Sequence, residues 1–166
     1  MKHLIDSVKL SMDTENWYSA LTLCLTLPDI AGKKEYPAEQ SSKIRFANWF
    51  EKYLTDYRYF HPVANEEIIF MSGNDCYALR CAFLHEGTFD ISMQRAQEII
   101  TNFEIIAPGE SKCVMHKNKM NDKLQLDVKI FCGKIIDAIS RWLSDISNDQ
   151  TKNEKLNLLM QMEQLK

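Results

Sequence analysis

Apolar residues recur every three or four positions over most of this chain, which is the spacing of helices with one buried face. The first stripe predicts a short helix near the start of the chain and consists of Leu4, Ile5, Val8 and Met12. A second helix is predicted after Asp13 or Thr14, either of which is a suitable cap, and it is expected to stop at Pro28. Its stripe consists of Trp17, Leu21, Cys24 and Leu25. We expect residues 29–40, which include a glycine and a second proline, to form a loop.

The clearest helical pattern begins at Ser41. Its predicted buried face consists of Phe46, Trp49, Phe50, Tyr53, Leu54 and Tyr57. Further on, the polar run 72–75 predicts a turn and a helix cap, followed by a helix from about Asp75 to Glu86. Gly87 is suited to a helix end with a positive φ. A short helix at 92–100 is expected next.

The period then changes from helical to extended. Short apolar runs at 103–107, 113–117 and 124–130 are separated by Pro108-Gly109 and Asn121-Asp122, which are typical of turns. They predict a small β-hairpin or three-strand meander inserted near residues 102–130.

Helical spacing returns after residue 130. The stripe here consists of Phe131, Ile135, Ile139, Trp142, Leu143 and Ile146. Beyond it, Leu158, Met162 and Leu165 share one helical face, which either packs on the body or meets a second subunit. The fold class predicted from these patterns is a mainly α helical bundle, forming a single domain over 1–166, with a small β insertion.

Composition and charge exclude several function classes. The chain has 166 residues and a net charge of −3, and its lysines and arginines are scattered, which argues against holding duplex DNA mainly by charge. An odd number of cysteines, five, fits reduced thiols in a cytosol. No apolar run resembles a signal peptide or a membrane span, so a cytoplasmic protein without membrane contact is expected. There is no Walker loop or dinucleotide-binding glycine motif, which argues against a nucleotide cofactor.

The segment from Asp75 to Gly87 contains the candidate catalytic residues of this chain. Arg80 is followed by four residues and then His85. Cleavage of RNA without a metal needs a base for the 2′-hydroxyl proton and a cation for the charge that develops on phosphorus, and His and Arg supply these. In an ideal helix, residues five apart are rotated by about 140°, so both can face one site only if the helix ends near His85.

This segment resembles the signature of the HEPN family: an Arg, four to six residues, then a His near a helix end, often with a Gly soon after. The resemblance implies a helical bundle of HEPN-like type and a metal-independent endoribonuclease, as found in bacterial defence or toxin systems. It also implies a homodimer whose composite cleft binds RNA, with Arg80 on the phosphate and His85 as base or acid. Asp75 and Glu86 are supporting candidates. Cys81 departs from the family pattern, which usually has a polar residue after the Arg.

Other functions remain open at this point. The main alternative is a non-catalytic helical module that binds a protein or a nucleic acid and keeps the motif for structure. A zinc-stabilised domain could use Cys81, His85, Cys113 and His116, although no metal or other cofactor is expected. The basic residues among the aromatics of 41–60 suggest an RNA-contacting face, but a core helix with a solvated face explains them better.

Overall fold

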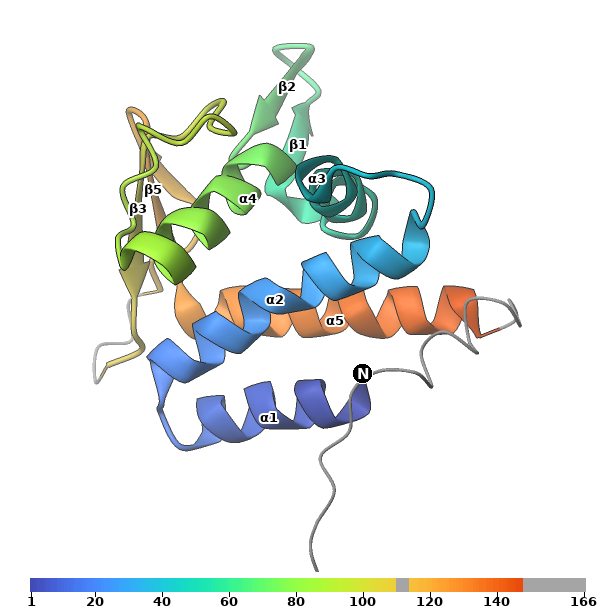
Figure 1. Cartoon of the computed structure of the whole chain (residues 1–166). Coiled ribbons are helices and arrows are strands. Elements are labelled where there is room, and N and C mark those ends of the chain that lie inside the picture. Colours follow the sequence, from blue (N-terminus) through green and yellow to red (C-terminus); the bar gives the residue numbers. More distant parts are fainter. Residues whose placement is uncertain (110–113, 148–166) are drawn as a thin grey trace, which may run out of the picture.

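The computed structural model describes residues 1–109 and 114–147 (Figure 1). Most of the described chain is helical, in α1 (Lys2–Asp13), α2 (Trp17–Glu35), α3 (Ser42–Tyr53), α4 (Gly73–Cys81) and α5 (Val128–Ile146). A 3-10 turn, η1 (Thr55–Tyr57), follows α3, and a π-helical turn, η2 (Ala82–Glu86), continues α4. The strands are β1 (Arg58–His61), β2 (Glu66–Ile69), β3 (Asn102–Ile106), β4 (Asn118–Met120) and β5 (Lys123–Asp127). The prediction of a mainly helical fold with a small amount of β structure is confirmed.

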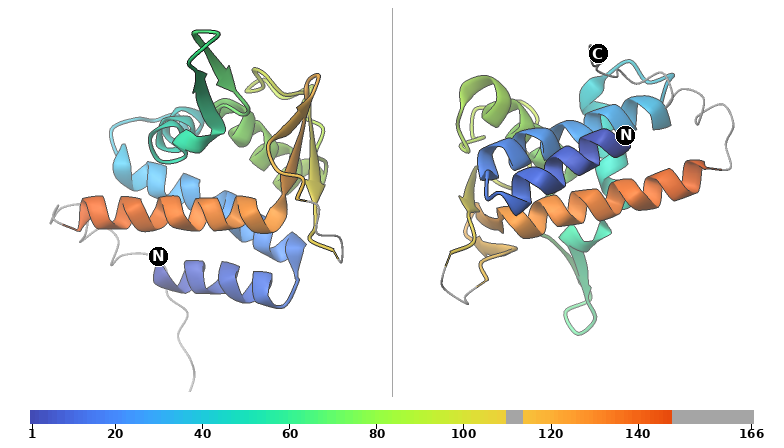
Figure 2. Two further views of the ribbon diagram at one scale, coloured as in Figure 1. Left: turned by 180° about the vertical axis from the view of Figure 1, so that it is seen from behind. Right: turned by 90° about the horizontal axis from the view of Figure 1, so that it is seen from below.

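Helix α2 lies at the centre of the described structure and packs against α1, α3 and α5 (Figures 1 and 2). Helix α4 packs on α3, and the three-stranded sheet lies at the end of the helical layer where α5 begins. The largest fully buried side chains come from α3, α5, the segment after α3 and strand β3: Trp49, Trp142, Tyr57, Phe46, Phe50, Phe103 and Phe131. Burial of such side chains contributes about 1.5–3 kcal/mol each to stability.

The expected face of α3 is buried as predicted, which makes its aromatic residues core rather than an RNA-contacting face. The Ser41 side chain caps the helix by accepting a hydrogen bond from the Ile44 amide at 3.4 Å. The predicted cap of α4 is also confirmed. Ser72 and Asp75 form a capping box, in which each side chain accepts from the other residue's backbone amide.

Helix α2 does not stop at Pro28, and this part of the prediction is wrong. The helix continues to Glu35 with Pro28 buried inside it, so residues 29–35 are helical rather than a loop. A proline inside a helix costs about 3 kcal/mol. Here the helix continues after the proline with the buried residues Ala31 and Gly32. Gly32 lets α2 approach α3 so closely that a Cβ added to this glycine would lie 2.7 Å from the Arg45 carbonyl oxygen. Packing therefore outweighs the local preference.

The caps proposed for α2 were also wrong. Helix α1 runs to Asp13, and Thr14 closes it by donating its hydroxyl to the Leu10 carbonyl at 2.8 Å. The cap of α2 is Asn16, whose side chain accepts from the Ser19 amide. Glu15 between them has φ 55, which breaks the two helices apart.

Residues 92–100 contain turns instead of the short helix that was expected. The amides of Glu98, Ile99 and Ile100 donate to the Asp75 Oδ1 atom at 2.8, 3.0 and 3.4 Å. Because a carboxylate on another element takes these donors, they are not available to helical carbonyls four residues earlier.

The β structure differs from a meander in its topology. The order is β3-β5-β4, with β3 and β5 parallel and β4 and β5 antiparallel. The run after 124 ends as a strand at Asp127, whose side chain accepts from the Ile130 amide and caps α5. The pattern also missed the hairpin of β1 and β2, which projects away from the helices (Figure 2).

None of the helices in the described part of the chain combines the length and apolar character needed to span a lipid bilayer. The stripe of Leu158, Met162 and Leu165 lies outside the described residues.

Candidate functional site

The π-helical turn η2 brings Arg80 and His85 together. The Arg80 Nη1 atom lies 3.1 Å from the His85 Nε2 atom. A π turn is one residue wider than an α turn, so side chains five apart lie on nearly the same face. Gly87 ends the turn with φ 68, as predicted, and its amide donates to the Phe83 carbonyl at 3.2 Å. The local backbone thus reduces the 140° separation of an ideal helix, and the two long side chains span the rest.

Asp29 of α2 holds the other side of Arg80. Its Oδ2 atom lies 2.8 Å from the Arg80 Nε, although the N–H direction is poorly aligned, so the contact is an ion pair more than a hydrogen bond. Both side chains are about one-fifth exposed, at 22% and 23%. Burial raises the pKa of the Asp29 carboxyl, and the nearby guanidinium groups of Arg80 and Arg45 oppose that rise.

Because Arg80 can only donate, it determines which hydrogen-bonding role the His85 Nε2 atom plays in this contact. A guanidinium has donors only, so the His85 Nε2 atom accepts and carries no proton. The imidazole is exposed at the end of the turn. The hydrogen bonds of the Arg80 guanidinium within the described part of the chain are made by its Nη1 atom. The pair therefore presents to solvent an imidazole whose Nε2 atom accepts from Arg80, beside a guanidinium that stays positively charged.

Asp75 lies on α4 but its carboxylate is engaged elsewhere. It is fully buried and accepts from the Ser72 amide and hydroxyl, besides the three amides of 98–100. It joins the start of α4 to that segment and has no described contact with Arg80 or His85. Its position indicates a structural role.

Glu86 is exposed beside His85, and its Oε1 atom accepts from the Gln94 side chain at 2.7 Å. This contact orients Glu86 toward the 92–100 segment. Neither supporting candidate therefore contacts the Arg80–His85 pair in the described structure.

The proposed zinc ligands are not brought together as far as they are described. His85 contacts Arg80, whereas His116 contacts the Tyr57 hydroxyl at 3.3 Å. Cys113 lies outside the described residues. Within residues 1–109 and 114–147, no group of three or more potential ligands could hold a metal. Cys76 on α4 is fully buried, and burial raises the pKa of its thiol, which makes it a poor nucleophile.

His116 makes folding stability sensitive to pH. Burial, followed by Lys117, lowers the pKa of His116 below its ordinary value of 6.5, and the Nδ1 atom is buried with no partner. The folded state binds this proton less readily than the unfolded state. The contribution of His116 to folding stability is therefore fully present above pH 6.5 and is lost as the pH falls below that value.

We expect His116→Gln to flatten the dependence of the free energy of unfolding on pH in this range, measured by urea unfolding between pH 5 and 7.5. An unchanged slope in the variant would assign the pH dependence to another group.

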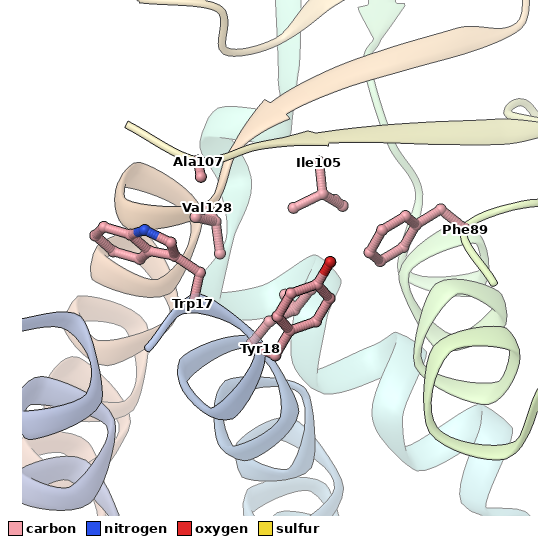
Figure 3. Close-up of a pocket in the computed structure, with 7 residues that line it drawn as sticks. Trp17, Tyr18, Phe89, Ile105, Ala107 and Val128 are labelled. Atoms are coloured by element: carbon pink, nitrogen blue, oxygen red, sulfur yellow. The ribbon is translucent and has the colours of Figure 1, made fainter. Parts of the chain in front are cut away.

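A small apolar hollow lies apart from the Arg80–His85 pair, between the start of α2 and β3 (Figure 3). Its volume is about 100 Å³, room for one side chain. The residues that line it are Trp17, Tyr18, Leu21, Phe89, Ile105, Ala107 and Val128. The sequence pattern did not indicate this hollow, because its lining comes from four separate segments.

Asp29 was also missed, because the pattern placed it in a loop after Pro28. The signal that could have placed Asp29 in a helix was the continuing apolar positions Ile30 and Ala31.

No family model matches the chain, and no curated protein or solved structure matches it.

Proposed function

We propose that this protein is a metal-independent endoribonuclease of HEPN-like type that acts as a homodimer, in a bacterial defence or toxin system. The observation that carries the proposal is the exposed contact between Arg80 Nη1 and His85 Nε2 at 3.1 Å. The motif spacing, the helix end at Gly87 and the mainly helical fold support it.

The chemistry follows from the two side chains. When the phosphate draws the Arg80 Nη1 donor away from His85, the freed Nε2 lone pair takes the proton of a 2′-hydroxyl, and the 2′-oxygen attacks the adjacent phosphorus. Arg80 stabilises the charge on the equatorial oxygens through its guanidinium donors and its fixed positive charge. The bond to the 5′-oxygen breaks, leaving a 2′,3′-cyclic phosphate and, after protonation, a 5′-hydroxyl.

Protonation of the leaving oxygen calls for a second group. One chain supplies a single imidazole at this site, and the homodimer supplies the second from the partner subunit. Arg80 is held by Asp29, so its fork keeps a defined direction toward the phosphate.

The second candidate function is a non-catalytic module that binds a protein or a nucleic acid. It is favoured by the fact that Arg80 already has two partners within its own chain, Asp29 and His85. In this reading the pair fastens the turn η2 to the end of α4, and the hydrogen bond serves stability alone.

The test is incubation of purified protein with a mixed RNA pool in EDTA, beside a folded His85→Ala variant that controls for contaminating nucleases. We expect fragments with 2′,3′-cyclic phosphate and 5′-hydroxyl ends from the natural protein only. Cleavage that is equal in both, or that requires a divalent metal, would contradict the proposal. RNA binding without cleavage would favour the module.

A further inference from the structure

Strand β3 is an edge strand, and only half of its outer edge is covered. The strand order places β5 on one side of β3. On the other side, the Phe103 amide donates to the Phe89 carbonyl and the Ile91 amide donates to the Thr101 carbonyl, both at 2.9 Å. An isolated bridge between Asp90 and Asn102 completes this cover. The cover ends at Phe103.

The outer edge beyond Phe103 is open. Backbone groups of alternate residues in a strand point to the same side, so the amide and carbonyl of Ile105 point outward as those of Phe103 do. They have no backbone partner among the described residues. Unpaired edge groups of this kind are a template for another strand.

The open edge and the apolar hollow lie side by side. Ile105 belongs to both: its backbone forms the edge and its side chain points into the hollow, facing Tyr18 (Figure 3). Phe89 closes one end, while Trp17 and Val128 form the opposite wall. A purely apolar ligand would leave the backbone groups unpaired, and a helix cannot pair with them because its own backbone groups bond internally. An extended polypeptide satisfies both.

We infer that this edge and hollow form a docking groove for an extended segment of a partner protein. The segment adds as a strand beside Ile105 and places one apolar side chain in the hollow. Main-chain hydrogen bonds supply affinity, and the hollow selects the anchoring side chain. This inference stands independently of the proposed ribonuclease function.

The charges next to the lining residues indicate the chemistry of the segment. Asp13 and Glu15 precede Trp17, and Asp90 follows Phe89, all three exposed, against one exposed base, Lys129, beside Val128. The surroundings are net acidic, so we expect basic residues to flank the apolar anchor.

As the occupant of the docking groove, a partner protein is favoured over the residues of this chain that follow position 147. The described chain reaches residue 147 at the far end of α5, whereas the groove lies at Val128, where α5 begins. At 1.5 Å per residue the two ends of this helix are about 27 Å apart. Residues after 147 would have to return along the whole helix to reach Ile105.

The experiment selects binders from a library of random short peptides on the full-length protein and measures their Kd by fluorescence anisotropy. Tyr18→Glu removes an aromatic ring that lines the hollow and is 74% exposed, so the fold is preserved. Tyr59→Glu is the matched control, since Tyr59 is 51% exposed on the projecting hairpin. We expect selected peptides with an apolar anchor and basic flanks, and a Kd about tenfold higher for Tyr18→Glu, or more, with no change for Tyr59→Glu.

A second variant and a second measurement test the edge itself. Ile105→Pro removes an outward amide and leaves the ladder to β5 intact, a position where edge strands tolerate proline, and it should also weaken binding. Hydrogen exchange at the Ile105 amide should slow when peptide is added.

Results of three kinds would overturn the inference. One is the absence of selected peptides, or equal binding to Tyr18→Glu. Another is an Ile105 amide already protected in the dilute free protein, which would identify the chain's own end as the occupant. The third is protection that rises with protein concentration alone, which would identify a second copy.

Discussion

Replacing Arg80 by alanine is expected to lower metal-independent RNA cleavage by about 10²- to 10³-fold, the loss typical when one donor to a developing oxyanion is removed. Among the described residues, Arg80 is the only cation in contact with His85. The variant loses the charge on the phosphate and the contact that holds the imidazole. The measurement is the rate of cleavage of a labelled RNA in EDTA, at saturating and at limiting RNA.

Two further variants separate charge from geometry at this position. Arg80→Lys keeps the charge but cannot reach Asp29 and His85 at once, so its rate should stay well below that of the natural protein. Asp29→Asn keeps the Arg80 charge and removes the ion pair. It should lower the rate less than Arg80→Ala does, and Asp29→Glu should restore part of it. Cleavage that is unchanged in Arg80→Ala would contradict a catalytic role and favour the binding module.

Replacing Asp75 by alanine is expected to lower the free energy of unfolding by about 3–5 kcal/mol. The carboxylate is fully buried and accepts from Ser72 and from the amides of Glu98, Ile99 and Ile100. Each donor left without an acceptor in a buried position costs about 1–3 kcal/mol. The loss is a large part of the 5–15 kcal/mol that stabilises a typical domain. Urea unfolding followed by circular dichroism measures it.

Asp127→Ala is the matched control for this prediction. Asp127 also caps a helix and is 8% exposed, but its side chain accepts only from the Ile130 amide among the described residues. We expect a loss of about 1 kcal/mol, the usual cost of removing a cap. If Asp75→Ala fails to fold, Asp75→Asn keeps one acceptor oxygen and allows the comparison. Equal losses at the two positions would show that the link to 98–100 contributes nothing.

The helices that the sequence predicted well are those whose signals are local. Ser41 and Ser72 each provide a cap, Gly87 provides the positive φ of a helix end, and the stripe around Trp49 has helical spacing. These features depend on neighbours within a turn or two. Such signals survive folding because tertiary packing agrees with them.

The errors arose where a distant residue overrides a local signal. Pro28 is a helix breaker by itself, yet packing of α2 on α3 at Gly32 keeps the helix going. Residues 92–100 have a helical pattern, yet Asp75 takes three of their amides. Neither contact is visible in sequence spacing, because the partners are far apart along the chain.

The sequence by itself determined that the chain is mainly helical, and it singled out Arg80 and His85 as the candidate catalytic residues. Only the tertiary structure decided that they meet, because the π turn is one residue wider than the helix that their spacing implies. It also placed Asp29 against Arg80 and left the edge of β3 open beside an apolar hollow. The physical reason is that residue types and local periods report the chemistry available, whereas the contacts between distant segments set which groups face one another.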